Sequence, residues 1–168
     1  VSMYKWDATK GADIIEREGI TNFTATPAIT GDLVVFSRET GRKFASLSTV
    51  GGGGASRAPE QVRAIDAVFE KAMPATGWGM TETSPVATIS YQRAELAGAS
   101  MDEKYRRASM AGTPAPLVDL RIRGEDGMDA PWDGKSVGEI QVRGPFITGS
   151  YHQVPVAPDK FTADGWLR

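Results

Sequence analysis

The sequence predicts an α/β fold, with a mixed sheet and packed helices in the first half and a β-rich second half. Up to Met73, strand-like segments alternate with amphipathic helices, which is typical of parallel βαβ units. After Pro85, two segments alternate apolar and polar residues with a period of two, as strands do. The 168 residues, 40% of them hydrophobic, are enough for the core of one domain or of two small lobes.

Helix and strand signals alternate in the first quarter of the chain. Asp7 is a plausible N-cap and Gly19 a plausible stop for a short amphipathic helix. β-branched and aromatic residues then alternate with small polar ones up to Pro27, which predicts a strand that ends there. A second helix is expected after it, ending at Gly41.

The clearest helix lies within residues 58–73, where Pro59 suits the first helical position. Before it, a strand at 44–50 runs into the glycines 51–54, and strand, glycine turn and helix together predict a crossover to a parallel strand. One face of this helix is apolar and is predicted to be buried: Val62, Ile65, Val68, Phe69 and Ala72.

The second half has a different character. Residues 86–90 are a strand candidate, and the polar stretch 93–109 is expected to be a surface loop or helix. Segments 117–123 and 137–143 alternate, and the turn-rich residues between them predict a long hairpin connection. We therefore divide the chain into an α/β part, residues 1–92, and a β-rich part, residues 93–168.

Composition excludes several kinds of function. The net charge of -2 and the lack of a long Lys/Arg cluster do not favour a nucleic-acid partner. With no cysteine, disulfides, thiol catalysis and cysteine metal sites are excluded. The one histidine, His152, lies in a polar segment where a solvated side chain is expected. No apolar run approaches the roughly 20 residues of a transmembrane helix, and no signal peptide is visible.

The glycines 51–54 lie between a predicted strand and a predicted helix. Glycine there lets the backbone approach a ligand closely and frees N–H groups for an anion. Neither G-x-x-x-x-G-K-[ST] nor G-x-G-x-x-G is present. Close approach to a ligand is favoured over a plain tight turn, because four consecutive glycines cost backbone entropy that a turn does not require.

The stretch GWGMTETSP, residues 77–85, places a ring, a carboxylate and two hydroxyls on flexible backbone. Trp78 can stack on a purine, Thr81 can donate to a phosphate oxygen, and Glu82 can bind Mg²⁺ shared with phosphates. The residues alone leave a second interpretation open, in which Trp78 belongs to the core and Thr81 and Glu82 cap a helix.

Together with three other segments, this stretch resembles the adenylate-forming superfamily of acyl-CoA synthetases, luciferases and peptide-synthetase adenylation domains. Within it, the chain looks most like medium- and long-chain fatty acyl-CoA ligases. The segments that carry the resemblance, in the family's order, are GGASRAPE at 53–60, GWGMTETSP at 77–85, AGTPAPLVDLRIRGEDG at 111–127, and VGEIQVRGPFITGSYHQVPVAPDKFTADGWLR at 137–168.

The resemblance implies a two-step reaction, in which a carboxylate attacks the α-phosphate of ATP and CoA then takes the acyl group from acyl-AMP. Catalytic roles fall to Thr81, which would bond the α-phosphate, and to Glu82, which would hold Mg²⁺. Trp78 would stack on adenine, in a place where the superfamily often has Tyr. The nucleotide site implied in this way comprises Gly53, Gly54, Ala55, Trp78, Gly79, Met80 and Thr81, with Gly79 leaving room for the acyl head.

The resemblance also implies parts that lie outside these 168 residues. A phosphate loop is expected before Val1, and a ribose-binding Asp and a C-terminal domain with a catalytic Lys are expected after Arg168. The resemblance therefore implies that both parts are pieces of one larger AMP-binding domain of a cytoplasmic ligase, with a peripheral position at a membrane also left open. We expect this central fragment to be inactive alone and able to self-associate. A ligase for an aryl or other acid, or an inactive AMP-binding module, stays open as an alternative.

Overall fold

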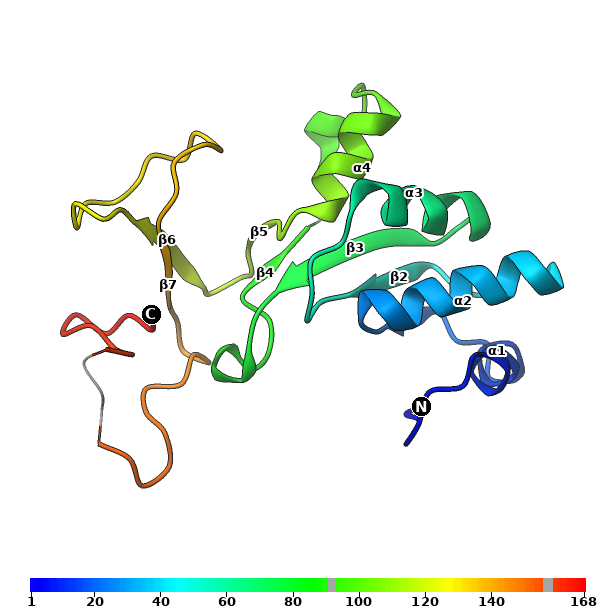
Figure 1. Cartoon of the computed structure of the whole chain (residues 1–168), viewed down its shortest axis with the longest axis horizontal. Helices are drawn as coiled ribbons and strands as arrows, with labels where there is room; N and C mark the ends of the chain where they lie inside the picture. Colours follow the sequence, from blue (N-terminus) through cyan, green and yellow to red (C-terminus); the bar gives the residue numbers. More distant parts are fainter. Residues whose placement is uncertain (91–92, 156–158) are drawn as a thin grey trace. The chain divides into compact units, whose positions relative to one another are not determined.

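The structure is a computed structural model that describes residues 1–90, 93–155 and 159–168 (Figure 1). The chain divides into two compact units. Unit 1 comprises Val1–Trp78 and Thr88–Thr113, and unit 2 comprises Gly79–Ala87 and Pro114–Arg168. The boundary expected from the sequence falls between residues 92 and 93, and Gln92 lies outside the described residues. Residues 156–158 of the last family-like segment also lie outside them.

Unit 1 is built on a mixed sheet with strand order β1-β2-β3-β4-β5. The first three strands are parallel, and β4 runs antiparallel to β3. The predicted crossover between parallel strands is therefore confirmed, and so is the mixed sheet of the predicted fold class. The strands are β1 (Asn22–Thr24), β2 (Thr49–Gly52), β3 (Met73–Trp78), β4 (Thr88–Ile89) and β5 (Thr113–Pro114), whose last residue is counted with unit 2.

The helices of unit 1 begin and end largely where their capping residues predict. Asp7 accepts a hydrogen bond from the Lys10 N–H at 2.9 Å, and Gly19 and Gly41 follow their helices with positive φ angles of 60° and 73°. Figure 1 shows α2 and α3 beside the ribbons of β2 and β3. The helices are α1 (Ala8–Arg17), α2 (Pro27–Thr40), α3 (Pro59–Val68), the short 3₁₀ helix η2 (Ala94–Leu96) and α4 (Met101–Ser109).

The core of unit 1 lies between these helices and the sheet. The predicted apolar face of α3 is buried: Val62, Ile65 and Val68, with Phe69 and Ala72 beyond the helix end. All of these except Val62 pack with residues of α1, α2 and β2 in one hydrophobic cluster. The polar stretch 93–109, for which loop and helix were both open, forms η2 and α4.

Three predicted boundaries in unit 1 are wrong. The strand expected to end at Pro27 ends at Thr24, because Thr26 is already the N-cap of α2. The strand expected at 44–50 begins only at Thr49 and continues through Gly51 and Gly52, which pair with β3. The reason is Phe44, which is buried against the ring of Phe69 in a turn with a φ of 47°. The helix expected up to Met73 ends at Val68, where Phe69 adopts an extended conformation.

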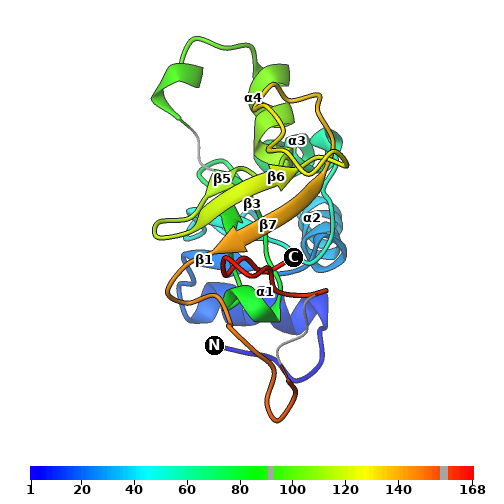
Figure 2. The same cartoon turned by 90° about the vertical axis from the view of Figure 1, so that its left-hand side faces the viewer.

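Unit 2 contains the predicted hairpin. Strands β6 (Asp119–Arg123) and β7 (Glu139–Arg143) are antiparallel (Figure 2). Leu120 is the register partner of Val142 across the pair. The residues between the strands form the long connection that the turn-rich sequence predicts. Leu167 then adds to the far side of β7 through two backbone hydrogen bonds with Val142, at 2.9 and 3.0 Å.

Several large apolar side chains are exposed in the described part of the chain. Among the most exposed are Met128, Trp132 and Val137 of the hairpin connection and Met73 of unit 1. Self-association stays a prediction, to be measured by light scattering. In the same residues, no helix is both long and apolar enough to cross a membrane.

Candidate functional site

The glycine turn after β2 is packed against the chain's own backbone. A Cβ at Gly52 would overlap the carbonyl oxygen of Ala25, and a Cβ at Gly53 would lie 2.8 Å from the carbonyl oxygen of Gly77. Gly54 has a φ of 83°, which favours glycine, and is exposed together with Ala55. Glycine is therefore required at Gly52 and Gly53 by internal packing. The sequence interpretation explained the glycine run by close approach to a ligand instead.

The turn lies at the carboxyl end of parallel strands, where open α/β sheets bind their ligands. Gly51 and Gly52 pair with Ala75 and Thr76, so residues 53–55 follow β2 beside the end of β3. The structure thus brings Gly53, in unit 1, next to Gly77, the residue before Trp78.

A buried arginine anchors the segment that follows the turn. Arg57 is 4% exposed, and its guanidinium donates to the carbonyl oxygen of Ala75 at 3.2 Å and to Oγ1 of Thr30 at 3.3 Å. Burial lowers its pKa. These bonds fix the turn to β3 and α2, and nothing in the local sequence pattern around Arg57 indicates this.

Trp78 ends β3 in unit 1. Its side chain is partly exposed, and its backbone N–H donates to Oγ1 of Thr88 on β4 at 3.3 Å. It is absent from the buried core of the described residues, so the interpretation of Trp78 as a core residue is not supported.

In unit 2, residues 79–85 form a tight turn around a buried hydroxyl. Thr83 is fully buried, and its Oγ1 accepts a hydrogen bond from the Met80 N–H at 2.9 Å. The same oxygen lies 2.9 Å from the carbonyl oxygens of Met80 and Pro85, to either of which it can donate. A Cβ at Gly79 would overlap the carbonyl oxygen of Pro85, so Gly79 is required by the turn itself.

This turn presents Thr81 and Glu82 to the surface. They lie in the single 3₁₀ turn η1 (Thr81–Thr83), where Thr81 is exposed and Glu82 partly so. The next element along the chain is the strand β4, so the alternative in which the two residues cap an α-helix is wrong. A hydroxyl residue and a carboxylate residue thus follow each other in one turn at the surface.

Glu82 is bound by a second segment of unit 2. The Tyr151 hydroxyl donates to Oε1 of Glu82 at 2.7 Å, and the Thr148 N–H donates to its carbonyl oxygen at 2.8 Å. The hydrogen bond from Tyr151 is the main cause that lowers the pKa of Glu82, and it raises the pKa of Tyr151. Glu82 is therefore a carboxylate at neutral pH.

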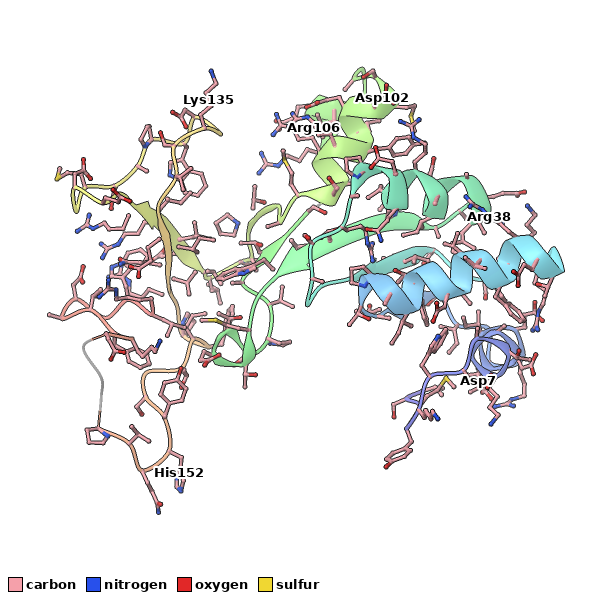
Figure 3. All side chains as sticks on the ribbon, in the orientation of Figure 1. Asp7, Arg38, Asp102, Arg106, Lys135 and His152 are labelled. Carbon is pink, nitrogen blue, oxygen red and sulfur yellow. The ribbon has the colours of Figure 1, made fainter. Side chains whose placement is uncertain are left out.

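Tyr151 was missed by the sequence interpretation. It lies 69 residues from Glu82, and no local spacing links the two. Its neighbour His152 is exposed and points away from the ribbon, as expected of a solvated histidine (Figure 3).

The predicted site residues thus fall into two groups. Gly53, Gly54, Ala55 and Trp78 belong to unit 1, and 79–82 belong to unit 2. The described residues contain no group of three or more His, Cys, Asp and Glu side chains that could hold a metal ion unaided. A hollow of about 1030 Å³ in unit 2 is lined by the hairpin connection and by none of these residues.

Comparison with known proteins supports the resemblance. Residues 1–152 match the family described as AMP-binding enzyme. A long-chain-fatty-acid–CoA ligase of Thermus thermophilus is 34% identical over 96% of this chain, and an indoleacetate–CoA ligase of Aromatoleum aromaticum is 33% identical over 98% of it. The chain spans 30% of the length of each of these relatives.

The fold agrees with this assignment. A luciferase-like enzyme from the nonluminescent mealworm Zophobas morio superposes with a TM-score of 0.79, at 20% identity, over 98% of this chain and 37% of its own. At that identity the likeness establishes the fold alone, and it confirms the predicted fold class. The match over residues 1–152, together with relatives more than 30% identical along nearly the whole chain, shows that this chain belongs to the AMP-binding enzyme family.

Proposed function

We propose that the protein to which this chain belongs activates a carboxylic acid with ATP and transfers the acyl group to CoA. In the first step the acid carboxylate attacks the α-phosphorus of ATP, the bond to pyrophosphate breaks, and acyl-AMP forms. In the second step the CoA thiol attacks the acyl carbonyl and AMP leaves. The observation that carries the proposal is the turn of unit 2, in which Thr81 and the ionised Glu82 are neighbours in the chain and both reach the surface.

Thr81 and Glu82 would act where charge accumulates. Thr81, whose hydroxyl is exposed, would donate to an α-phosphate oxygen as negative charge builds at phosphorus. Glu82 would hold Mg²⁺, which when bound neutralises charge on the phosphate oxygens. A single partly exposed carboxylate fits this ion, because Mg²⁺ is usually held by one or two carboxylates together with substrate phosphates.

The remaining predicted residues would shape the nucleotide site. Trp78, whose ring is partly exposed, would stack on adenine, a contact worth roughly 1–3 kcal/mol. Gly53, Gly54 and Ala55 would offer backbone groups to the nucleotide. Gly54 and Ala55 are exposed. Gly79 and Met80 would line the approach to Thr81. The space beside Gly79 that was expected to hold the acyl head is filled by the carbonyl oxygen of Pro85, so we do not assign that role to Gly79.

A fatty acid is the proposed substrate, and an aryl acid is the alternative. The Thermus relative is named for long-chain fatty acids and the Aromatoleum relative for indoleacetate, so the relatives support both classes. Use of ATP and CoA supports a cytoplasmic location, with a peripheral position at a membrane if the acid has a long chain.

The proposal is tested by pyrophosphate release from the full-length protein, with ATP, Mg²⁺, CoA and a panel of acids. We expect release with medium- and long-chain fatty acids, and more slowly with aryl acids. Substitution of Thr81 by Val should lower kcat about 10²-fold with little change in the KM for the acid, because one transition-state donor is lost. Release with none of the acids would contradict the proposal, and release with aryl acids alone would select the alternative.

The 168-residue chain by itself is expected to give no release. Measurable adenylate formation by the isolated chain would contradict that expectation.

A further inference from the structure

We propose that Tyr151 is a positioning residue for the carboxylate of Glu82, which it holds in the orientation that binds a divalent cation on a nucleotide. The inference rests on the proposed function, in which Glu82 is the metal ligand. It adds a residue from a segment far along the chain, close to the end of the region that matches the family.

The contact has the geometry of a strong, charge-assisted hydrogen bond. The phenol oxygen of Tyr151 lies 2.7 Å from Oε1 of Glu82. The ring of Tyr151 packs edge-on against Phe161, with 6.2 Å between ring centroids, and Phe161 is largely buried. The donor is therefore held by packing on one side, while its hydroxyl reaches the carboxylate.

The two segments are joined independently of the phenol. The Thr148 N–H donates to the carbonyl oxygen of Glu82, and the Ser84 hydroxyl donates to the carbonyl oxygen of Phe146, both at 2.8 Å. Neither contact involves the Tyr151 hydroxyl, so both should remain when only that hydroxyl is removed. Substitution of Tyr151 by Phe therefore tests the orientation of the carboxylate and leaves the attachment of the loop intact.

The arrangement leaves the carboxylate able to bind a cation. An ionised carboxylate has about four lone-pair sites on two oxygens, and the phenol occupies one of them on Oε1. A Glu side chain that is already fixed loses less rotamer freedom when a cation binds. Partners that orient metal ligands in this way typically change metal affinity 10- to 100-fold when they are removed.

The chain offers a matched control in unit 1. The Tyr105 hydroxyl donates to Oδ2 of Asp66, also at 2.7 Å and also at the surface, but between α4 and α3. Substitution of Tyr105 by Phe removes the same type of bond outside the proposed site. Both variants should keep the urea midpoint close to that of the unmodified protein, because surface substitutions of this kind change stability little.

The experiment measures binding of Mn²⁺ to the full-length protein with ATP, by electron paramagnetic resonance, and needs no turnover. We expect Tyr151→Phe to raise the Kd for Mn²⁺ about tenfold and Tyr105→Phe to leave it unchanged. The Kd for ATP without metal should stay the same in both variants, because the phenol acts through the carboxylate.

A double-mutant cycle with Glu82→Gln separates the possible outcomes. If Tyr151 acts through Glu82, Tyr151→Phe has no further effect once Glu82 is Gln. If Glu82→Gln weakens Mn²⁺ binding but Tyr151→Phe does not, or if the two effects add, the inference is overturned and the proposed function stands. If Glu82→Gln binds Mn²⁺ normally, Glu82 is not the ligand, and both the proposed role of Glu82 and the inference fall.

Discussion

Oγ1 of Thr83 lies 2.9 Å from the backbone nitrogen of Met80, inside the turn that carries Thr81 and Glu82. No part of Thr83 reaches solvent. One buried hydroxyl therefore fixes the backbone beneath two exposed residues that are proposed to act on a nucleotide.

Removal of that hydroxyl should destabilise the turn. Thr83→Val keeps the shape but leaves the Met80 N–H without its partner, at a cost of about 1–3 kcal/mol in the free energy of unfolding. Urea denaturation followed by circular dichroism measures the loss. Thr83→Ser retains the hydroxyl and is the matched control, and equal losses in the two variants would show that the methyl group matters instead.

The glycines near the proposed site should differ in their tolerance of alanine. Gly79→Ala places a Cβ on the carbonyl oxygen of Pro85, so the turn must move and the free energy of unfolding should fall by several kcal/mol. In Gly54→Ala the added Cβ meets only Cγ2 of Thr26, at 3.8 Å. This substitution should lower the free energy of unfolding by about 1 kcal/mol, because the φ of 83° is unfavourable for alanine.

Gly98→Ala serves as the control, because nothing lies within 4 Å of its added Cβ. Thermal unfolding of the three variants gives the ranking. A Gly79→Ala variant as stable as Gly98→Ala would contradict the explanation of why glycine is required at 79.

These glycines also show where prediction from the sequence stopped. The helices were predictable because their signals are local: Asp7 and Pro59 at helix starts, Gly41 after a helix end, and an apolar face at helical spacing on α3. The glycine run was read as room for a ligand. Gly52 and Gly53 also pack against Ala25 and Gly77, which come from other segments of the chain and leave no signal in the local pattern. Close approach of this turn to a ligand stays a prediction.

The candidate site was predicted to a similar extent. Thr81 and Glu82 were identified through the family resemblance, and the structure places both on the surface of one turn. The contacts of Tyr151 and Arg57 were not predicted, because each residue bonds to a partner at least 18 residues away in the chain. The role of such a side chain can be identified only once the fold shows which distant residue it contacts.

The stacked ring of Trp166 should be important for the stability of unit 2. The guanidinium carbons of Arg121 and Arg143 lie 4.2 and 4.6 Å from its ring centroid, and the ring is 8% exposed. Trp166→Ala removes both cation–π contacts and the buried ring, and should lower the free energy of unfolding by about 3 kcal/mol. Trp166→Phe keeps an aromatic face, so it should lose clearly less; urea denaturation that finds equal losses would argue against the stacking.

The Glu103 carboxylate on α4 should make stability depend on pH. Hydrogen bonds from Arg106, and then from Arg107, lower the pKa of Glu103 to about 2. A carboxyl group whose pKa is lower in the folded state stabilises that state above its unfolded value of about 4.3, and this contribution disappears as the pH falls towards 2.

Glu103→Gln should therefore lower the urea midpoint at pH 7 and leave it unchanged at pH 2. The difference at pH 7 should shrink in 1 M salt, because the three side chains are at the surface and salt screens their charges. A difference that does not depend on pH would assign the effect to helix propensity rather than to charge.

The order of the two units in the sequence determines which of them can fold first during translation. Unit 1 has all of its residues once synthesis has passed Thr113, whereas unit 2 must wait for the residues that follow. The turn with Thr81 and Glu82 is therefore translated before Phe146, Thr148 and Tyr151, the residues from which it gains its contacts. Until those residues are synthesised, Thr81 and Glu82 lack the segment that holds their turn in place. A nascent chain paused after Thr113 should therefore expose this turn to proteases and chaperones, although unit 1 can already fold.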